Sequence, residues 1–396
     1  MSVASTVADA PSSSPVVHRG ALIASLGLLA LGAVAITSTV SARQAALFLI
    51  GACAGLVLYH AAFGFTSSWR DFIVHRRGRG LRAQMLMLGV TTMVFVPLIA
   101  RGSIAGQVVR GSVAPAGIPV IAGALLFGIG MQLGGGCASG TLFSAGGGSV
   151  RMLVTLAAFI AGSVLGIRFT AIWDHAPALR PISLLGEFGA GPALALSLGA
   201  FALIGVIVTA AESRAVGPTK DPAAGRATLL HGPWTMAAGA IGLAVVNIST
   251  LVIAGRPWGV TAAFALWGSK IAMAAGLNVA AWPYWQVPAR AADLQASVLR
   301  DVTSVMDLGI MLGALAAAAL AGRFAPVWRV PGRSLAAAVV GGVMLGYGAR
   351  IAFGCNIGAY FSGVASTSLH GWVWLASAFC GNIVGTRLRP WFGLAV

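Results

Sequence analysis

Two cysteines stand in glycine-rich segments that could present a thiol to a small ligand. Cys137 lies in GGGCASG, residues 134–140, and Cys355 lies in GCNIG, residues 354–358. Each glycine inside a helix costs about 1 kcal/mol relative to alanine, so neither segment is expected to continue an ordinary helix. We expect a short helix, then a glycine turn that presents the thiol, then a second short helix that begins beside it.

A thiol at the start of a helix meets free backbone N–H groups and a dipole that favours an anion. Its sulfur is soft and polarizable and its S–H group is a weak donor, which suits contact with another sulfur atom. The alternative is a small buried hydrophobe, the commonest fate of cysteine, and we assign it to Cys53 and Cys380. The predicted path for a small sulfur oxyanion is lined by Cys137, Cys355, Gly136, Gly354, Ser139, Asn356, Thr141, Gly140, Gly358, Thr66 and Thr261.

The two cysteine segments belong to a longer internal repeat. Residues 123–144 (GALLFGIGMQLGGGCASGTLFS) and 341–362 (GGVMLGYGARIAFGCNIGAYFS) share eight positions at a constant offset of 218, including the cysteine, a phenylalanine and a serine. Earlier in each half, GFTS at 64–67 is similar to GVTA at 259–262, which pairs Thr66 with Thr261. A duplication kept only for packing, with glycines at close helix contacts, is the alternative interpretation.

The composition indicates that these segments are held by membrane helices. The chain has 396 residues, of which 58% are hydrophobic and only 9% charged, against about 25% charged in a soluble domain. This excludes a soluble enzyme, a disordered chain and a nucleic-acid-binding protein. The net charge of +16 fits arginine-rich cytoplasmic loops rather than a nucleic-acid partner. The predicted fold class is an all-α polytopic membrane protein in contact with lipid.

A helix needs about 20 apolar residues to cross the hydrocarbon core. Residues 1–19 are predicted to form a disordered tail, residues 20–233 a first membrane half with an extra helix at 20–41, and residues 234–396 a second half. We expect nine or ten spans plus broken or re-entrant segments, because residues 259–288 are apolar but interrupted by Trp282-Pro283-Tyr284. The predicted spans lie near 20–41, 45–64, 83–100, 118–133, 151–170, 191–211, 234–254, 302–322, 335–353 and 372–390.

Loop charges predict the orientation of the chain. Residues 70–82 hold five arginines, so this loop and both termini are expected in the cytoplasm. Residues 64–67 then lie at the cytoplasmic end of their span and residues 259–262 at the outer end of theirs. The two halves would therefore be inverted repeats, an arrangement that puts a substrate site near the bilayer midplane where the halves meet.

Other polar residues suggest weaker hypotheses. Asp307 and Lys270 lie in apolar stretches, where they could pair or Asp307 could carry a coupling proton. A local ion pair is expected for Arg70-Asp71. An interfacial aromatic belt is expected for Trp258, Trp267, Trp282 and Trp285. No P-loop, metal-ligand spacing or Ser-His-Asp pattern is found, so we predict a transporter without cofactor or metal rather than an enzyme.

These motifs also carry a family resemblance. The segments GGGCASGTLFSAGGGSVR and FGCNIGAYFSGVASTSLHGW resemble two signatures of the YeeE/YedE sulfur-transport family, and GFTSSWRD and RPWGVTAAFALWGSKI are similar to its remaining signatures. The resemblance covers roughly residues 45–396. It implies a bacterial inner-membrane carrier that imports thiosulfate, whose cysteines pass the ion by S–H···S contacts. It also implies delivery to a cytoplasmic TusA-like sulfur carrier or rhodanese.

The chain departs from that family at one position. A third cysteine opens the segment before the Arg-Asp pair in characterised thiosulfate importers, and Gly64 stands there in this sequence. Some members of the family are associated with selenium metabolism. The alternatives are therefore a transporter of a selenium compound, a membrane thiol protein that accepts or transfers sulfane sulfur, and a structural partner of another permease.

Overall fold

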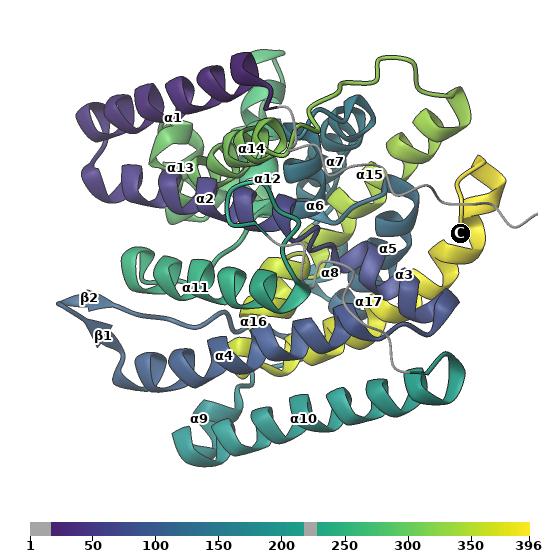
Figure 1. Cartoon of the computed structure of the whole chain (residues 1–396). Helices are drawn as coiled ribbons and strands as arrows, with labels where there is room; N and C mark the ends of the chain where they lie inside the picture. The colour runs from purple at the N-terminus through teal and green to yellow at the C-terminus, as the bar shows by residue number, and fades with distance from the viewer. Residues whose placement is uncertain (1–16, 218–227) are drawn as a thin grey trace, which may run out of the picture.

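The computed structural model describes residues 17–217 and 228–396, and most of these residues lie in helices (Figure 1). Most of the predicted tail, residues 1–16, lies outside the described part. Ten long helices form the scaffold: α1 (Arg19–Thr39), α2 (Ala42–His60), α4 (Arg79–Arg101), α5 (Ile118–Gly134), α7 (Val150–Arg168), α10 (Ala190–Ala215), α11 (Met236–Ala254), α14 (Val302–Leu320), α15 (Gly332–Ile351) and α17 (Leu369–Leu388).

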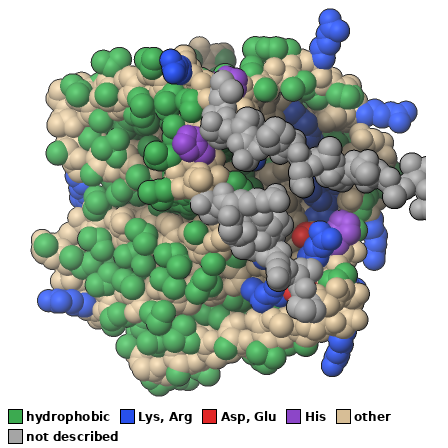
Figure 2. Space-filling view, in the orientation of Figure 1, with side chains coloured by type: hydrophobic (Ala, Val, Ile, Leu, Met, Phe, Trp, Pro, Cys, Tyr) green, Lys and Arg blue, Asp and Glu red, His purple; other side chains and the backbone are tan. Residues whose placement is uncertain are grey.

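Each of the ten predicted spans coincides with one of these long helices. Within the described residues, nine helical segments are long and apolar enough to cross a membrane, and α17 is the less apolar tenth helix. Figure 2 shows hydrophobic side chains spread over the middle of one face, with most Lys and Arg side chains at its right-hand side. The protein is therefore an all-α multi-pass membrane protein. The expected division at residues 233–234 stays a prediction.

Short elements interrupt or connect the long helices. The short α-helices are α3 (Phe65–His75), α6 (Ala138–Gly146), α8 (Ala171–Asp174), α9 (Leu184–Phe188), α12 (Thr261–Ala274), α13 (Pro288–Gln295) and α16 (Ser362–Ala365). A π-helical turn, η4 (Asn356–Phe361), precedes α16, and the 3₁₀ turns are η1 (Val279–Ala281), η2 (Pro283–Gln286), η3 (Val298–Arg300) and η5 (Arg389–Phe392). The apolar stretch 259–288 is thus a 14-residue helix followed by tight turns, too short to span a bilayer.

Two small antiparallel ribbons lie at the ends of the long helices. Strand β1 (Ser103–Ile104) pairs with β2 (Gln107–Val108) directly after α4, and β3 (Ala116–Gly117) pairs with β4 (Ala178–Leu179). We call the side of the molecule that carries these ribbons the hairpin face; β1 and β2 lie at the left of Figure 1. The opposite side carries Arg76 and Arg77 between α3 and α4, and we call it the arginine-rich face.

The long helices pack in pairs whose backbones touch at glycines. A Cβ atom on Gly51 of α2 would collide with the backbone of Met306 in α14, and one on Gly55 would collide with Ile310. The numbers of the contacting residues increase together along the two helices, so α2 and α14 run parallel. Small residues permit this close approach, which gains dispersion energy where no hydrophobic effect operates between helices in lipid.

Three more pairs of long helices pack side by side, and two of them also meet at glycines. Helix α7 packs along α15, α5 along α17, and α4 along α11. Gly162 of α7 meets Val343 of α15, and Gly128 of α5 meets Ala378 of α17. In each of the four pairs one helix comes from residues 17–217 and the other from residues 228–396. The paired helices surround the short segments α3, α6, α12 and η4, which contain the predicted site residues.

Candidate functional site

Cys137 caps the start of helix α6. Its sulfur accepts a hydrogen bond from the backbone N–H of Gly140 at 3.4 Å and lies 3.4 Å from the hydroxyl oxygen of Ser139. The hydroxyl of Thr141 donates to the carbonyl oxygen of Cys137 at 2.8 Å. The chain reaches this position through a turn at Gly135, whose φ of 90° favours glycine. Gly136 completes the turn, so this segment has the predicted order of helix, glycine turn, thiol and short helix.

Cys355 occupies the equivalent position before η4. It is fully buried, and Gly354 before it adopts a φ of 146°, in the range that glycine adopts most readily. The indole N–H of Trp374 donates to the carbonyl oxygen of Gly354 at 3.2 Å and holds the turn. The following element is a π-helical turn rather than the expected α-helix, and π-helical turns occur frequently at functional sites.

Asn356 is the polar group that the fold leaves unsatisfied beside Cys355. It is fully buried, and neither its amide nitrogen nor its amide oxygen has a hydrogen-bond partner among the described residues. Gly358 stands two residues further on, where its carbonyl oxygen accepts from the Ser112 hydroxyl at 3.2 Å and its Cα lies near that of Gly259. A buried polar group without a partner costs free energy, so the Asn356 amide is left with unused hydrogen-bonding capacity.

The structure brings the two cysteine segments together. Helix α6 contacts η4, and Cys137 and Cys355 belong to one buried cluster. Gly140 and Gly358, each three residues after its cysteine, carry no side chain to fill the space beside the helix start. The two thiols therefore lie in one buried cluster, and Ser139 and Asn356, close to them in sequence, are buried as well.

Thr66 and Thr261 begin the short helices α3 and α12. The carbonyl oxygen of Thr66 accepts from the side-chain amide of Gln132 at 3.1 Å, and the hydroxyl of Thr261 accepts from the guanidinium of Arg350 at 3.3 Å. Gln132 and Arg350 are separated by 218 residues, the offset of the repeat. Repeat-related side chains thus make related contacts in the two halves.

The polar neighbours of the site include residues that the sequence analysis missed. Gln132 and Arg350 are two of them, and applying the repeat offset to polar positions as well as to glycines would have found them. Trp258 was expected in an interfacial belt instead, but its indole nitrogen is buried without a partner in the part of the chain that the structure describes. Asp307 on α14 is fully buried with both carboxylate oxygens likewise unpartnered.

Several expectations about polar pairs are wrong. Lys270 does not pair with Asp307, because its ammonium donates to the carbonyl oxygens of Leu294 and Ala296 at 2.8 and 2.7 Å. Arg70 donates to the side-chain oxygen of Gln132 at 3.3 Å, whereas Asp71 pairs with His75 one turn along α3.

Two expectations about burial also need correction. Trp258 and Trp285 are buried, so the four tryptophans do not form a surface belt. Cys53 and Cys380 are exposed on the helix surfaces rather than packed in the core.

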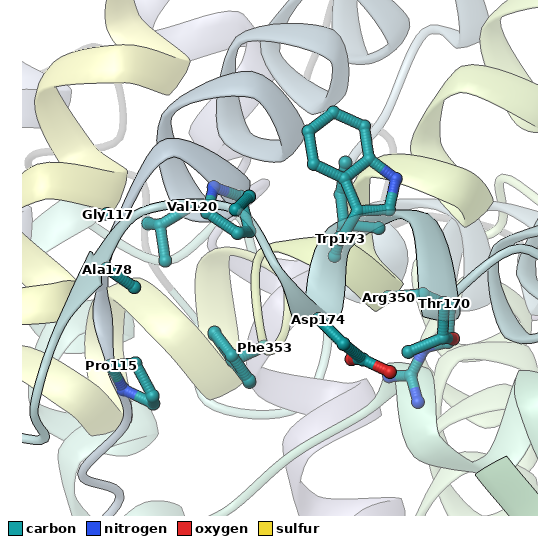
Figure 3. Close-up of a pocket in the computed structure, with 12 residues that line it drawn as sticks. Pro115, Gly117, Val120, Thr170, Trp173, Asp174, Ala178, Arg350 and Phe353 are labelled. Atoms are coloured by element: carbon teal, nitrogen blue, oxygen red, sulfur yellow. The ribbon is translucent and has the colours of Figure 1, made fainter. Parts of the chain in front are cut away.

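Cavities approach the cysteine segments from both faces. On the hairpin face, a cavity of about 230 Å³ is lined by Trp173, Arg350 and Phe353, the last one residue before Gly354 (Figure 3). On the other side, a cavity of about 450 Å³ is lined by Ser144, Gly147 and Arg151. Arg151 donates to the carbonyl oxygen of Gly134 at 2.7 Å, beside the Cys137 turn.

Comparison with known proteins identifies the family. A sequence model described as sulphur transport matches residues 60–384, which is most of the chain. The chain belongs to this sulphur transport family. The match includes both cysteine segments together with Thr66 and Thr261.

Individual relatives agree with this membership. The chain is 33% identical to the probable transporter YedE of Salmonella typhimurium over 168 residues, 41% of this chain and 40% of that protein. It therefore aligns with well under half the length of YedE. It is 28% identical to the thiosulfate transporter TsuA of Spirochaeta thermophila over 365 residues, 87% of this chain and 97% of that protein. Identity to TsuA of Escherichia coli is 24% over 349 residues, 84% of this chain and 91% of that protein.

Proposed function

We propose that this protein imports a small sulfur oxyanion, thiosulfate, across the bacterial inner membrane along a path past Cys137 and Cys355. The observation that carries the proposal is the pair of buried thiols, each at the start of a short helix, with an unpartnered Asn356 amide beside them. Family membership and the names of the TsuA relatives support the same substrate class.

The chemistry of the path suits a sulfur anion. Backbone N–H groups at the two helix starts and the Ser139, Thr141 and Asn356 side chains offer neutral donors to the oxyanion oxygens. Each thiol offers a weak S–H donor and a polarizable surface to the terminal sulfur of thiosulfate. Neutral donors hold an anion less tightly than an arginine clamp would, so the ion can leave as well as enter. No bond to sulfur forms or breaks, and no cofactor is required.

We infer further that the two halves are inverted repeats around this path. Matching α2, α4, α5 and α7 with α11, α14, α15 and α17 in chain order maps each packed helix pair onto another packed pair. This matching carries the α2–α14 contact onto α11–α4 and the α7–α15 contact onto α17–α5. The related contacts of Gln132 and Arg350 with Thr66 and Thr261 support the same relation. Inverted halves with interrupted helices place their substrate site at the interface between them.

The arginine-rich face is the cytoplasmic face in this proposal. Positive loops stay on the cytoplasmic side during insertion, which places the hairpin face outside and both chain ends inside. A TusA-like sulfur carrier or a rhodanese in the cytoplasm would then receive the imported sulfur at the arginine-rich face.

The deciding experiment is uptake of labelled thiosulfate by the purified protein in proteoliposomes. We expect saturable uptake above that of protein-free vesicles, with competition by thiosulfate stronger than by sulfate, sulfite, sulfide or selenite. Preference for selenite would assign the path to selenium compounds. The opposite outcome is that the vesicles take up no thiosulfate while a persulfide accumulates on Cys137 with turnover. The protein would then be a sulfur-transfer protein and not a transporter.

A further inference from the structure

The cavity on the hairpin face is lined in part by Arg350, a charged residue that the proposed path past the two thiols does not include. It lies between the loop before α5, the short helix α8 and the end of α15, and its lining includes Pro115, Thr170, Trp173, Asp174 and Arg350 (Figure 3). The indole N–H of Trp173 donates to the hydroxyl of Tyr347 at 2.9 Å and fixes one wall. A cavity of about 230 Å³ holds a four- or five-atom oxyanion with its water.

Arg350 connects this cavity to the thiol path. Its guanidinium donates to the hydroxyl of Thr261 and to that of Tyr284, both at 3.3 Å. Its Nε atom is buried and has no partner among the described residues, so the guanidinium keeps an unused donor. A Cβ atom on Gly166 would lie 2.7 Å from the Cβ of Arg350, so glycine at position 166 makes room for this side chain. The guanidinium is thus held between the cavity and the start of α12.

The repeat-related position in the first half of the chain holds an uncharged side chain. Gln132, which the repeat aligns with Arg350, contacts Thr66 through a neutral amide. A guanidinium also lies near Gln132, but Arg70 donates to the side-chain oxygen of that amide, and no hydrogen bond joins Arg70 to Thr66 among the described residues. On the hairpin face the guanidinium of Arg350 therefore contacts Thr261 directly. On the arginine-rich face the guanidinium of Arg70 contacts Gln132, and it is Gln132 that contacts Thr66.

We propose that the hairpin-face cavity is a separate anion-binding site and that Arg350 is its specificity-determining residue for doubly charged oxyanions. This inference rests on the proposed function, which it deepens by naming the group that selects the ion. The planar guanidinium offers the anion a charge-assisted hydrogen bond before the ion reaches Thr261 and Cys355. Asp174 in the same cavity opposes the anion's charge and keeps it from being held too long.

The substitution Arg350→Gln tests the proposal, because glutamine already occupies the repeat-related position. We expect the KM for thiosulfate uptake to rise about 10- to 100-fold, with kcat changed far less, because a charge-assisted contact is lost in capture. Sulfate should inhibit the original protein competitively and lose this effect in the variant. Arg350→Lys should fall between the two, and Asp174→Asn should lower the KM. Thermal unfolding in detergent provides the folding control.

Calorimetric titration of the purified protein with thiosulfate and with sulfate separates this proposal from the proposed function. One outcome is that the original protein takes up thiosulfate and a folded Arg350→Gln variant does so with the same KM. This would overturn the role of Arg350 and would still support thiosulfate transport. Arg350-dependent binding of both anions without uptake would retain the site and reject transport. Binding that is the same in both proteins would overturn the inference.

Discussion

At the scale of single residues, the two buried thiols differ in their surroundings. The sulfur of Cys137 already has the Gly140 N–H and the Ser139 hydroxyl as neighbours. Cys355 stands beside Asn356, whose amide has no partner in the described structure. An unsatisfied buried polar group costs about 1–3 kcal/mol, and an anion that accepts from the Asn356 amide would recover part of this. We therefore expect the ion to rest longer beside Cys355 than beside Cys137.

Replacing both thiols should separate a substrate path from ordinary packing. The double variant Cys137→Ala, Cys355→Ala should lower the initial rate of thiosulfate uptake about 30-fold or more, because each of the two removed contacts contributes about 1–3 kcal/mol. The matched control is Cys53→Ala, Cys380→Ala, which removes two exposed thiols and should keep most of the uptake. Uptake close to that of the original protein in the first double variant would leave only a glycine-lined path.

The residues of the site were predictable only in part. The cysteines and Thr66 with Thr261 could be found because the repeat marks them in the sequence. Arg350 could have been located through the repeat offset, but its contacts, like the burial of Asp307 without a partner among the described residues, depend on which helices meet. The expected Asp307–Lys270 pair failed for a related reason: carbonyl groups left free at the end of α13 satisfy Lys270 locally.

At the scale of elements, close glycine contacts hold the helix pairs. A Cβ atom on Gly313 of α14 would collide with the backbone of Ala52 in α2, so no side-chain adjustment can accommodate it. A Cβ atom on Gly199 of the peripheral helix α10 would meet nothing within 4 Å. The same substitution should therefore have opposite effects at these two positions.

Gly313→Ala should destabilise the protein by about 1–3 kcal/mol, because the two helices must move apart. Gly199→Ala should be neutral or stabilising by up to about 1 kcal/mol, because alanine favours a helix. Thermal unfolding in detergent measures both variants under the same conditions. An unchanged Tm in Gly313→Ala would contradict the close α2–α14 contact.

Hydropathy predicted the positions of all ten long helices, because each has to match the thickness of the hydrocarbon core. It could not resolve residues 259–301, where apolar composition continues past the end of α12. There the 3₁₀ turns at Val279–Ala281 and Pro283–Gln286 follow from the Trp282-Pro283 sequence and from burial of Trp285 against Ser269. The π-helical form of η4 also had no sequence signal that separates it from an α-helix.

At the scale of the whole molecule, the two faces should be on opposite sides of the membrane. Arg77→Cys lies on the arginine-rich face and Ser103→Cys on the hairpin face, and both positions are exposed. In a background with Cys53 and Cys380 replaced by serine, an impermeant thiol reagent added outside intact cells should label position 103 alone. Position 77 should react only after the membrane is opened. Labelling of both positions from outside would contradict the proposed orientation.

The four helix pairs also limit how this molecule can move. Each pair joins a helix from residues 17–217 to one from residues 228–396, so the two sequence halves are interlocked. Swinging one half against the other, as rocking carriers do, would disrupt all four pairs at once. We expect the scaffold to stay still while α3, α6, α12 and η4 shift by small amounts. Ions would then pass the two cysteine segments one at a time, at a rate that a few side chains control, as in a channel.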